Sequence, residues 1–213
     1  MSYKQVPLVV IKRLPRYHRY LGELLKNNVS RISSTDLSEK MGVTASQIRQ
    51  DLNFFGGFGQ QGYGYNVEML YNRVSSILGL DKGYKTIIIG CGNLGHALAN
   101  YTGFANRGFT LCAMFDTDKE KIGTEIAGLT VKPCSELEEY IKLEKPDIAI
   151  LAVPKTAVVS VADEIVSYGI KALWNFAYVD LNLPGDVTVE NVHLSDSLMT
   201  LSYRMSENKG NDF

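Results

Sequence analysis

Three glycines between residues 90 and 95 have the spacing of a turn that binds a dinucleotide. The run Gly90-Cys91-Gly92-Asn93-Leu94-Gly95 directly follows an apolar stretch. In this G-x-G-x-x-G pattern the first glycine makes the tight turn, and the second lets the backbone approach a pyrophosphate. The third lets the following helix pack on the preceding strand. All six residues are therefore candidate cofactor-binding residues.

A carboxylate at the end of the next predicted strand, over residues 109–115, is placed to select the cofactor. Asp116 follows the glycine run by about twenty residues, the spacing at which an acid accepts hydrogen bonds from the adenosine ribose. Such an acid also repels a 2′-phosphate, so the sequence favours NAD(H) over NADP(H). Asp118 is a nearby competitor, but the strand end favours Asp116.

Two more loops should reach the same crevice, because ligands gather at the carboxyl ends of parallel strands. Ala152-Val153-Pro154 follows one predicted strand, and Asn175-Phe176-Ala177 follows the next. Either loop could also be ordinary packing at a strand end. The candidate cofactor-binding residues in these loops are Ala152, Val153, Pro154, Phe176 and Ala177.

No set of residues suited to catalysis accompanies these loops. The three histidines, His18, His96 and His193, are scattered, and no Ser-x-x-x-Lys or Tyr-x-x-x-Lys pair stands at a strand end. No metal ligands cluster in the sequence. We therefore predict a protein that is not an enzyme and holds no metal. Oxidation of Cys91 could interfere with a cofactor, but a small buried residue is the alternative interpretation.

Residues 81–193 have the pattern of a Rossmann-type α/β domain, a parallel sheet covered by helices. Apolar runs alternate there with helical stretches. The first helix is predicted over residues 93–106, with Leu94, Leu98 and Tyr101 on its buried side. The predicted strands cover residues 86–90, 109–115, 130–132 (weakly), 147–153, 170–174 and 187–193.

The first eighty residues differ from the rest of the chain in charge. Residues 1–80 contain ten Lys/Arg and five Asp/Glu, which is a net charge of +5. Residues 81–213 contain twelve Lys/Arg and eighteen Asp/Glu, which is −6, so that the whole chain has −1. A basic segment joined to an acidic one indicates that the first meets a polyanion, with chance scatter of charge as the alternative.

Composition also restricts where the protein works. No apolar run is long enough to span a membrane. The N-terminus lacks the layout of a secretory signal. The cysteines, Cys91, Cys112 and Cys134, have no CxxC spacing and are odd in number, which favours a reducing compartment. We expect a cytoplasmic protein.

Within residues 1–80 we predict a helix-turn-helix. After a first helix that opens around Leu14-Pro15, a short helix capped by Ser34 or Thr35 closes at Gly42. A further helix then runs from Thr44 to about residue 55, with Ile48, Leu52 and Phe55 facing inward.

This arrangement predicts binding to double-stranded DNA. The second helix of such a motif lies in the major groove, with its N-terminal residues at the base edges. The glycines and aromatic residues of 56–65 fit the wing of a winged helix. Helix-turn-helix shapes also serve as protein–protein modules, which is the alternative. The candidate DNA-binding residues are Arg13, Arg16, Thr44, Ala45, Ser46, Gln47, Arg49, Gln50, Gln60, Gln61 and Tyr63.

The last segment, residues 194–213, is predicted to be an amphipathic helix. Leu194, Leu198, Leu201 and Met205 recur at the spacing of one helix face. This stripe follows the last strand, after the helices of the sheet have been used, so it needs a partner. A second subunit is the favoured partner, and docking on the same chain is the alternative.

Taken in order, these motifs resemble the Rex family of bacterial redox-sensing transcriptional repressors over essentially the whole chain. The glycine run carries the resemblance together with four further stretches. These are Arg13-Leu14-Pro15-x-Tyr17, Ser46-x-Ile48-Arg49-x-Asp51-Leu52, Gly62-Tyr63-Gly64-Tyr65-Asn66-Val67 and Asn175-Phe176-Ala177.

The resemblance implies a homodimer whose winged helices bind an inverted-repeat operator and whose C-terminal helices are exchanged between subunits. It implies that NADH closes the dimer and releases the DNA, while NAD+ binds more weakly and permits DNA binding. It places Tyr101 near the nicotinamide. It also implies that Arg49 couples the DNA domain to the cofactor domain.

The sequence departs from the family pattern in two places. Gln60 and Gln61 stand at the wing tip where relatives usually have basic residues, which should make DNA binding less dependent on salt. His193 stands where relatives commonly have an aspartate that partners Arg49 and Tyr101. Either Asp196 replaces that acid, or the conformational switch of this protein uses different contacts.

Two other functions fit parts of the same sequence. A small NAD-dependent oxidoreductase with an accessory N-terminal domain would explain the glycine run, but not the missing acid/base set. A winged-helix regulator could instead sense another nucleotide, such as coenzyme A, which Asp116 does not exclude.

Overall fold

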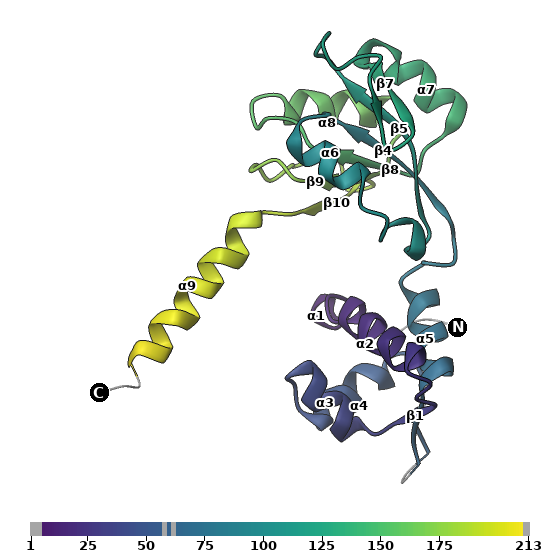
Figure 1. The fold of residues 1–213 in the computed structure, drawn as a ribbon, viewed down its shortest axis with the longest axis vertical. Helices are drawn as coiled ribbons and strands as arrows, with labels where there is room; N and C mark the ends of the chain where they lie inside the picture. The colour runs from purple at the N-terminus through teal and green to yellow at the C-terminus, as the bar shows by residue number, and fades with distance from the viewer. Residues whose placement is uncertain (1–5, 57–58, 61–62, 211–213) are drawn as a thin grey trace. The chain divides into compact units, whose positions relative to one another are not determined.

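The computed structural model describes residues 6–56, 59–60 and 63–210. Contacts divide the chain into two compact units, Met1–Lys82 and Gly83–Phe213. Figure 1 shows the helices and strands of both. Each unit has its own hydrophobic core, so we describe them separately.

The first unit is built from short helices and a small sheet. Its sheet has three antiparallel strands in the order β1-β3-β2. The helices are α1 (Leu8–Ile11), α2 (Leu14–Lys26), α3 (Ser34–Met41), α4 (Ala45–Asn53) and α5 (Val67–Ile77), and the strands are β1 (Arg31–Ile32), β2 (Gly59–Gln60) and β3 (Gly64–Asn66).

The helix-turn-helix is formed by α3 and α4, and local capping fixes its ends. The side chain of Ser33 accepts a hydrogen bond from the amide of Asp36 at 3.0 Å, so the predicted caps Ser34 and Thr35 were wrong by one or two residues. At Gly42 the chain adopts a left-handed conformation, with φ of 62°, that ends α3. Thr44 then caps α4 by accepting from the amide of Gln47 at 3.1 Å.

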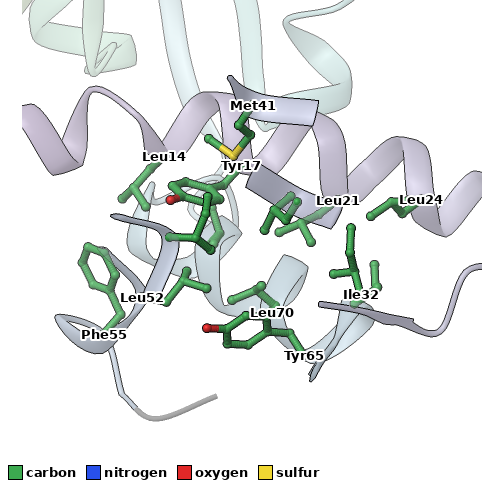
Figure 2. Close-up of a cluster of buried hydrophobic side chains, with 14 of the residues drawn as sticks. Leu14, Tyr17, Leu21, Leu24, Ile32, Met41, Leu52, Phe55, Tyr65 and Leu70 are labelled. Atoms are coloured by element: carbon green, nitrogen blue, oxygen red, sulfur yellow. The ribbon is translucent and has the colours of Figure 1, made fainter. Parts of the chain in front are cut away.

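The core of the first unit joins α2 to the helix-turn-helix and to the hairpin β2–β3. The predicted inward residues Ile48, Leu52 and Phe55 are all buried. Figure 2 shows this cluster, in which Tyr17 and Leu14 of α2 lie among residues from the other elements. The hairpin lies in the predicted wing, and β1 adds a strand that the sequence did not predict.

The second unit is a parallel sheet with the strand order β10-β9-β8-β4-β5-β7-β6. Among the described strands of this sheet, β6 and β7 pair antiparallel and the other neighbours pair parallel. The strands are β4 (Tyr84–Ile89), β5 (Phe109–Asp116), β6 (Glu125–Ile126), β7 (Leu129–Pro133), β8 (Ile148–Leu151), β9 (Ala172–Asn175) and β10 (Thr188–Asn191). The Rossmann-type sheet predicted from the sequence is confirmed, and β6 was not predicted.

The two faces of this sheet are covered differently. Helices α7 (Leu137–Glu144) and α8 (Val158–Ser167) pack on one face, where Ile87 and Ile89 of β4 point. On the other face, residues of α6 (Asn93–Ala99) pack beside Ile88. The remaining elements are the short 3-10 helices η1 (Ala105–Arg107) and η2 (Cys134–Glu136) and the C-terminal helix α9 (Leu194–Gly210).

The helix after the glycine turn is shorter than the sequence predicted. Instead of reaching residue 106, α6 ends at Ala99. The Asn100 side chain donates to the backbone oxygen of His96 at 2.9 Å, which satisfies a terminal carbonyl, and Gly103 disfavours further helix. Tyr101 therefore follows the helix and is 53% exposed, so its predicted place on a buried helix face was wrong.

In the described part of the chain, no helix has the length and apolar character needed to cross a membrane.

Candidate functional site

The glycine turn joins β4 to α6 with little room around two of its glycines. Gly90 has φ of 96°, and a Cβ there would lie 2.6 Å from the backbone oxygen of Ala152. A Cβ on Gly95 would overlap the backbone oxygen of Gly90, so this glycine lets α6 approach the strand. By contrast, a Cβ on Gly92 would meet nothing within 4 Å. The open side of the turn is therefore at Gly92, where a pyrophosphate was predicted to approach.

Asp116 lies at the end of β5 and holds this turn. Its carboxylate accepts hydrogen bonds from the backbone amide of Cys91 at 2.6 Å and from that of Asp118 at 2.9 Å. Burial alone would raise the pKa of Asp116, but these hydrogen bonds and the Lys121 charge lower it below its ordinary value. The carboxylate is thus charged and positioned at the predicted ribose site, although it is only 8% exposed.

The other predicted loops meet at the same edge of the sheet. The amide of Ala152 donates to the backbone oxygen of Ile89 at 2.9 Å, and the amide of Phe176 donates to the backbone oxygen of Leu151 at 3.0 Å. A side-chain carbon of Val153 lies next to Gly90, while Pro154 is exposed. The structure thus brings the ends of β4, β8 and β9 together, as expected from the strand order.

Asn175 shapes the loop after β9, a role that the sequence reasoning missed. Its side chain is fully buried and donates to the backbone oxygen of Val179 at 2.7 Å and to the side chain of Asn191 at 2.8 Å. It also accepts from the amide of Ala177 at 2.9 Å. A buried amide with these bonds fixes the position of Phe176 and Ala177. The sequence carried two signals, the polar residue at the end of an apolar strand and its place in a stretch that carries the family resemblance, but neither gave these contacts.

A row of aromatic rings extends from the segment after α6 to the end of β9. Tyr101 packs edge-on against Phe104 with ring centroids 4.8 Å apart. Phe104 packs against Trp174 at 5.5 Å, and Trp174 against Phe176 at 4.6 Å. Except for Phe176, these residues line a mostly apolar cavity of about 500 Å³ over β4, β8, β9 and β10. The predicted place of Tyr101 beside a nicotinamide stays a prediction.

Cys91 is a buried thiol. It is 5% exposed, and its sulfur lies 3.5 Å from the backbone oxygen of Phe115. Burial first, and then the charge of Asp116, raise the pKa of Cys91 to about 11. A thiol with this pKa stays protonated near neutral pH and reacts slowly, which favours the interpretation as a small buried residue. Among the described residues, no group of His, Cys, Asp and Glu could hold a metal ion.

His193 lies beside an acid that neither sequence alternative included. Its Nε2 is 3.0 Å from a carboxylate oxygen of Asp180, in the connection between β9 and β10. Its Nδ1 is buried and has no hydrogen-bond partner within the described segments, and its ring packs against Tyr178. Asp196, the other candidate, is exposed in the first turn of α9, and its amide donates to the backbone oxygen of His193 at 3.1 Å. Nothing in the sequence pointed to the loop residue Asp180.

The N-cap and first turns of α4 present four of the predicted DNA-contacting side chains. Thr44, Ser46, Arg49 and Gln50 are exposed, while Ala45 is half-buried. A guanidinium nitrogen of Arg49 donates to the hydroxyl of Ser34 at 2.9 Å, which steadies the side chain on the surface of the motif.

Other predicted DNA contacts are engaged inside the unit, around the buried carboxylate of Asp51. Arg13 donates to both Asp51 oxygens at 2.7 Å. Tyr17 donates to the same carboxylate at 2.9 Å, and so does Gln47. Burial would raise the pKa of Asp51, but the hydrogen bonds from Arg13, Gln47 and Tyr17 lower it below its ordinary value. The cluster links α2 to α4 and so fixes the angle of the candidate recognition helix.

Of the remaining predicted DNA contacts, Arg16 bonds within the unit and the wing residues are described only in part. Arg16 donates to the backbone oxygen of Met41 at 2.6 Å, which ties α2 to α3. Tyr63 is 69% exposed at the hairpin. Only the backbone of Gln60 is described, and Gln61 lies outside the described residues.

Comparisons with known families match both units. A family described as "Putative DNA-binding protein N-terminus" matches residues 5–53, and one described as "CoA binding domain" matches residues 81–179. Two relatives carry the description "Redox-sensing transcriptional repressor Rex". The one from Thermoanaerobacter pseudethanolicus is 61% identical over 97% of this chain and 93% of its own, and the one from Clostridium botulinum is 52% identical over 97% and 98%.

Solved structures of RSP, a Rex-family repressor, match nearly the whole chain. The complex of RSP with β-NAD+ and operator DNA has a TM-score of 0.91 at 60% identity and covers 97% of this chain and 95% of its own. The complex with β-NADH has a TM-score of 0.90 at 57% identity and covers 97% of both chains. With identities of this size over nearly full lengths, the chain belongs to the Rex family of redox-sensing transcriptional repressors.

Proposed function

We propose that this protein is a DNA-binding repressor that senses the ratio of NADH to NAD+. The observation that carries the proposal is the joining, in one chain, of a helix-turn-helix to a sheet whose glycine turn is open at Gly92. The solved relatives that match it bind β-NADH in one case, and β-NAD+ with operator DNA in another. The free cysteines and the family to which the chain belongs support a cytoplasmic location.

The second unit would hold NAD(H) at the carboxyl edge of its sheet. The backbone around Gly92 leaves space for the pyrophosphate. The Asp116 carboxylate would accept hydrogen bonds from the ribose hydroxyls. Ala152, Val153, Pro154, Phe176 and Ala177 would form the wall, with Asn175 fixing the last two. When bound, the nicotinamide carries the redox state that is read, and no residue here needs to transfer a proton to it.

The first unit would bind the operator with α4 in the major groove. Thr44, Ser46, Arg49 and Gln50 offer hydrogen-bond donors and acceptors on its exposed side. Arg13 and Gln47 support the helix through Asp51, and in this proposal they also lie next to the DNA backbone. Gln60, Gln61 and Tyr63 of the wing would lie along the backbone of the DNA, with few positive charges.

We further propose a homodimer in which α9 is exchanged between subunits. Leu194, Leu198, Leu201 and Met205 are each more than half exposed along this helix of 17 residues. Such an apolar stripe needs a partner, and the two-fold symmetry of an inverted-repeat operator calls for two copies. Each subunit would thereby stabilise the other.

Release of DNA by NADH requires that the closed dimer bind NADH better than the open one does. A change from mostly open to mostly closed needs a preference of about 5.5 kcal/mol. A polar network would transmit this conformational change from the second unit to the first. It would include Arg49, Tyr101 and the segment with His193 and Asp196. In this chain Asp180 supplies the acid beside His193.

The test is the affinity for an inverted-repeat operator duplex, measured by fluorescence anisotropy, with NADH, NAD+ and coenzyme A added separately. The proposal predicts release by NADH alone, at concentrations where NAD+ has little effect. Release by coenzyme A and not by NADH would instead favour the ligand named in the family description that matches residues 81–179. An operator affinity that no ligand changes would contradict the sensor function.

A further inference from the structure

The ammonium group of Lys121 lies between two carboxylates just after β5. Its Nζ is 3.2 Å from an oxygen of Asp118 and 3.5 Å from an oxygen of Asp116. The two acids outnumber the single lysine, so the cluster has a net negative charge. Lys121 and Asp118 are partly exposed, whereas Asp116 is nearly buried.

This cluster contains both kinds of group that decide between the two forms of a nicotinamide cofactor. An acid at the end of this strand favours a free ribose 2′-hydroxyl, whereas a nearby cation accommodates a 2′-phosphate. Asp116 is the acid, and Lys121 is a cation within reach of the same place. The preference therefore depends on what holds the lysine.

Asp118 holds the lysine through a tight turn. One of its carboxylate oxygens accepts from the amide of Glu120 at 3.0 Å, which fixes the side chain. The amide of Lys121 donates to the backbone oxygen of Asp118 at 3.0 Å, which folds the lysine back over the acid. The hydrogen bond to Asp118 is also the main cause that raises the pKa of Lys121.

We propose that Asp118 determines cofactor specificity: by engaging Lys121, it keeps the ammonium group from a 2′-phosphate and so makes the site select NADH over NADPH. This inference rests on the proposed function, because it places the adenosine ribose at Asp116. A 2′-phosphate, with a charge of nearly −2, would meet two carboxylates and a cation that is already paired.

Asp118 can be tested separately from Asp116. Removing the Asp116 carboxylate would also remove the acceptor of the Cys91 amide and disturb the glycine turn for every dinucleotide. In Asp118→Asn the side-chain oxygen can still accept from Glu120, so the turn is kept while the charge is lost. The substitution therefore weakens the hold on Lys121 and removes one of the two carboxylate charges, while the turn is kept.

The experiment measures the affinity of the full chain for ADP-ribose and for its 2′-phosphorylated form by calorimetry. These probes occupy the ribose site without the nicotinamide. The native chain should prefer ADP-ribose. In Asp118→Asn, binding of the 2′-phosphorylated form should strengthen about tenfold, while binding of ADP-ribose should change less than about twofold.

Adding Lys121→Met to Asp118→Asn should abolish this gain, because the freed ammonium group is what binds the phosphate. Asp163→Asn, which removes one exposed carboxylate from α8, is the matched control for net charge and should leave both affinities unchanged. Should Asp118→Asn fold poorly, Lys121→Met alone must weaken 2′-phosphate binding further without affecting ADP-ribose.

An unchanged ratio of the two affinities in Asp118→Asn, or a gain that survives Lys121→Met, would overturn the inference and leave the proposed function intact. A native chain that binds neither ADP-ribose nor NADH would overturn both.

Discussion

Each unit contains a charged carboxylate that is almost buried, but the two are held in different ways. Within the described residues, Asp51 of the first unit accepts hydrogen bonds from the side chains of Arg13, Tyr17 and Gln47. Asp116 in the second unit accepts from the backbone amides of Cys91 and Asp118. The position of Asp51 depends on several side chains together, and its hydrogen bonds hold α4 against α2. The position of Asp116 depends on the backbone of the loops around it, so its carboxylate stays available to a ligand.

The comparison separates a buried charge that joins two helices, Asp51, from one that we propose for cofactor recognition, Asp116. A carboxylate whose partners come from two helices is an anchor, and its loss should damage the whole unit. The loss of a carboxylate that is held by loop amides should affect mainly the binding of a ligand at that loop. The experiments below test the anchor in the first unit and the glycine turn that Asp116 holds in the second.

The largest expected effect is that of Asp51→Ala. Removing one partner of a buried pair leaves the Arg13 charge without its carboxylate, which should cost about 3 kcal/mol of unfolding free energy. Urea unfolding of the full chain should show the loss in the first unit, and operator binding should fail. Binding of NADH should be unaffected, since it belongs to the second unit.

Glu39→Ala is the control for Asp51→Ala, because Glu39 is an exposed acid on α3 of the same unit. It should change the unfolding free energy by less than about 0.5 kcal/mol. If the two variants were equally stable, Asp51 would not be an anchor.

Next in size is the effect of Gly92→Ala on the cofactor. The added methyl group meets no protein atom within 4 Å, and φ at this residue is −72°, so the fold should be unchanged. The methyl group should occupy the space of the pyrophosphate and weaken NADH binding by at least about tenfold, or about 1.4 kcal/mol. Operator binding should persist but no longer respond to NADH.

Gly95→Ala sharpens the result for Gly92→Ala. Here the methyl group would overlap the backbone oxygen of Gly90, so the second unit itself should lose stability. A thermal melt should separate the two variants. Equal melting temperatures together with a normal NADH response in Gly92→Ala would mean that the turn is not the cofactor site.

The pH dependence of stability should show the Asp51 anchor directly. Because the pKa of Asp51 is lowered by folding, its contribution is fully present above the ordinary carboxyl pKa of about 3.9. That contribution is lost as the pH falls through the lower pKa of the folded state. Urea unfolding between pH 2.5 and 6 should therefore show a steeper acid loss in the native chain than in Asp51→Ala. Parallel curves would contradict the lowered pKa.

The smallest expected effect concerns Cys91. With its pKa raised to about 11, this thiol should react with iodoacetamide only slowly at pH 7, and faster as the pH approaches 11. Mass spectrometry of the labelled chain checks this. Rapid labelling at pH 7 that also blocks NADH binding would restore a redox role for the residue.

The sequence predicted those parts of the fold and site whose signals are local. The glycine run follows an apolar strand, and Gly42 separates two capped helices, so both units were identified from short stretches. Asp51 and Asp180 were missed as partners because their contacts join distant parts of the chain. Asp51 meets Arg13, 38 positions earlier, and Asp180 meets His193 across a loop. The end of α6 was also missed, because the side-chain cap at Asn100 competes with an otherwise helical pattern.

The central claim is that NADH in the second unit and operator DNA in the first oppose each other. The most direct measurement is the NADH dissociation constant of the full chain with and without saturating operator duplex, by calorimetry. Coupling between two binding sites is reciprocal, so the operator should weaken NADH binding by the same factor by which NADH weakens operator binding. The account predicts a shared factor well above one, lost in Gly92→Ala. An NADH affinity that is the same with and without operator DNA would contradict it.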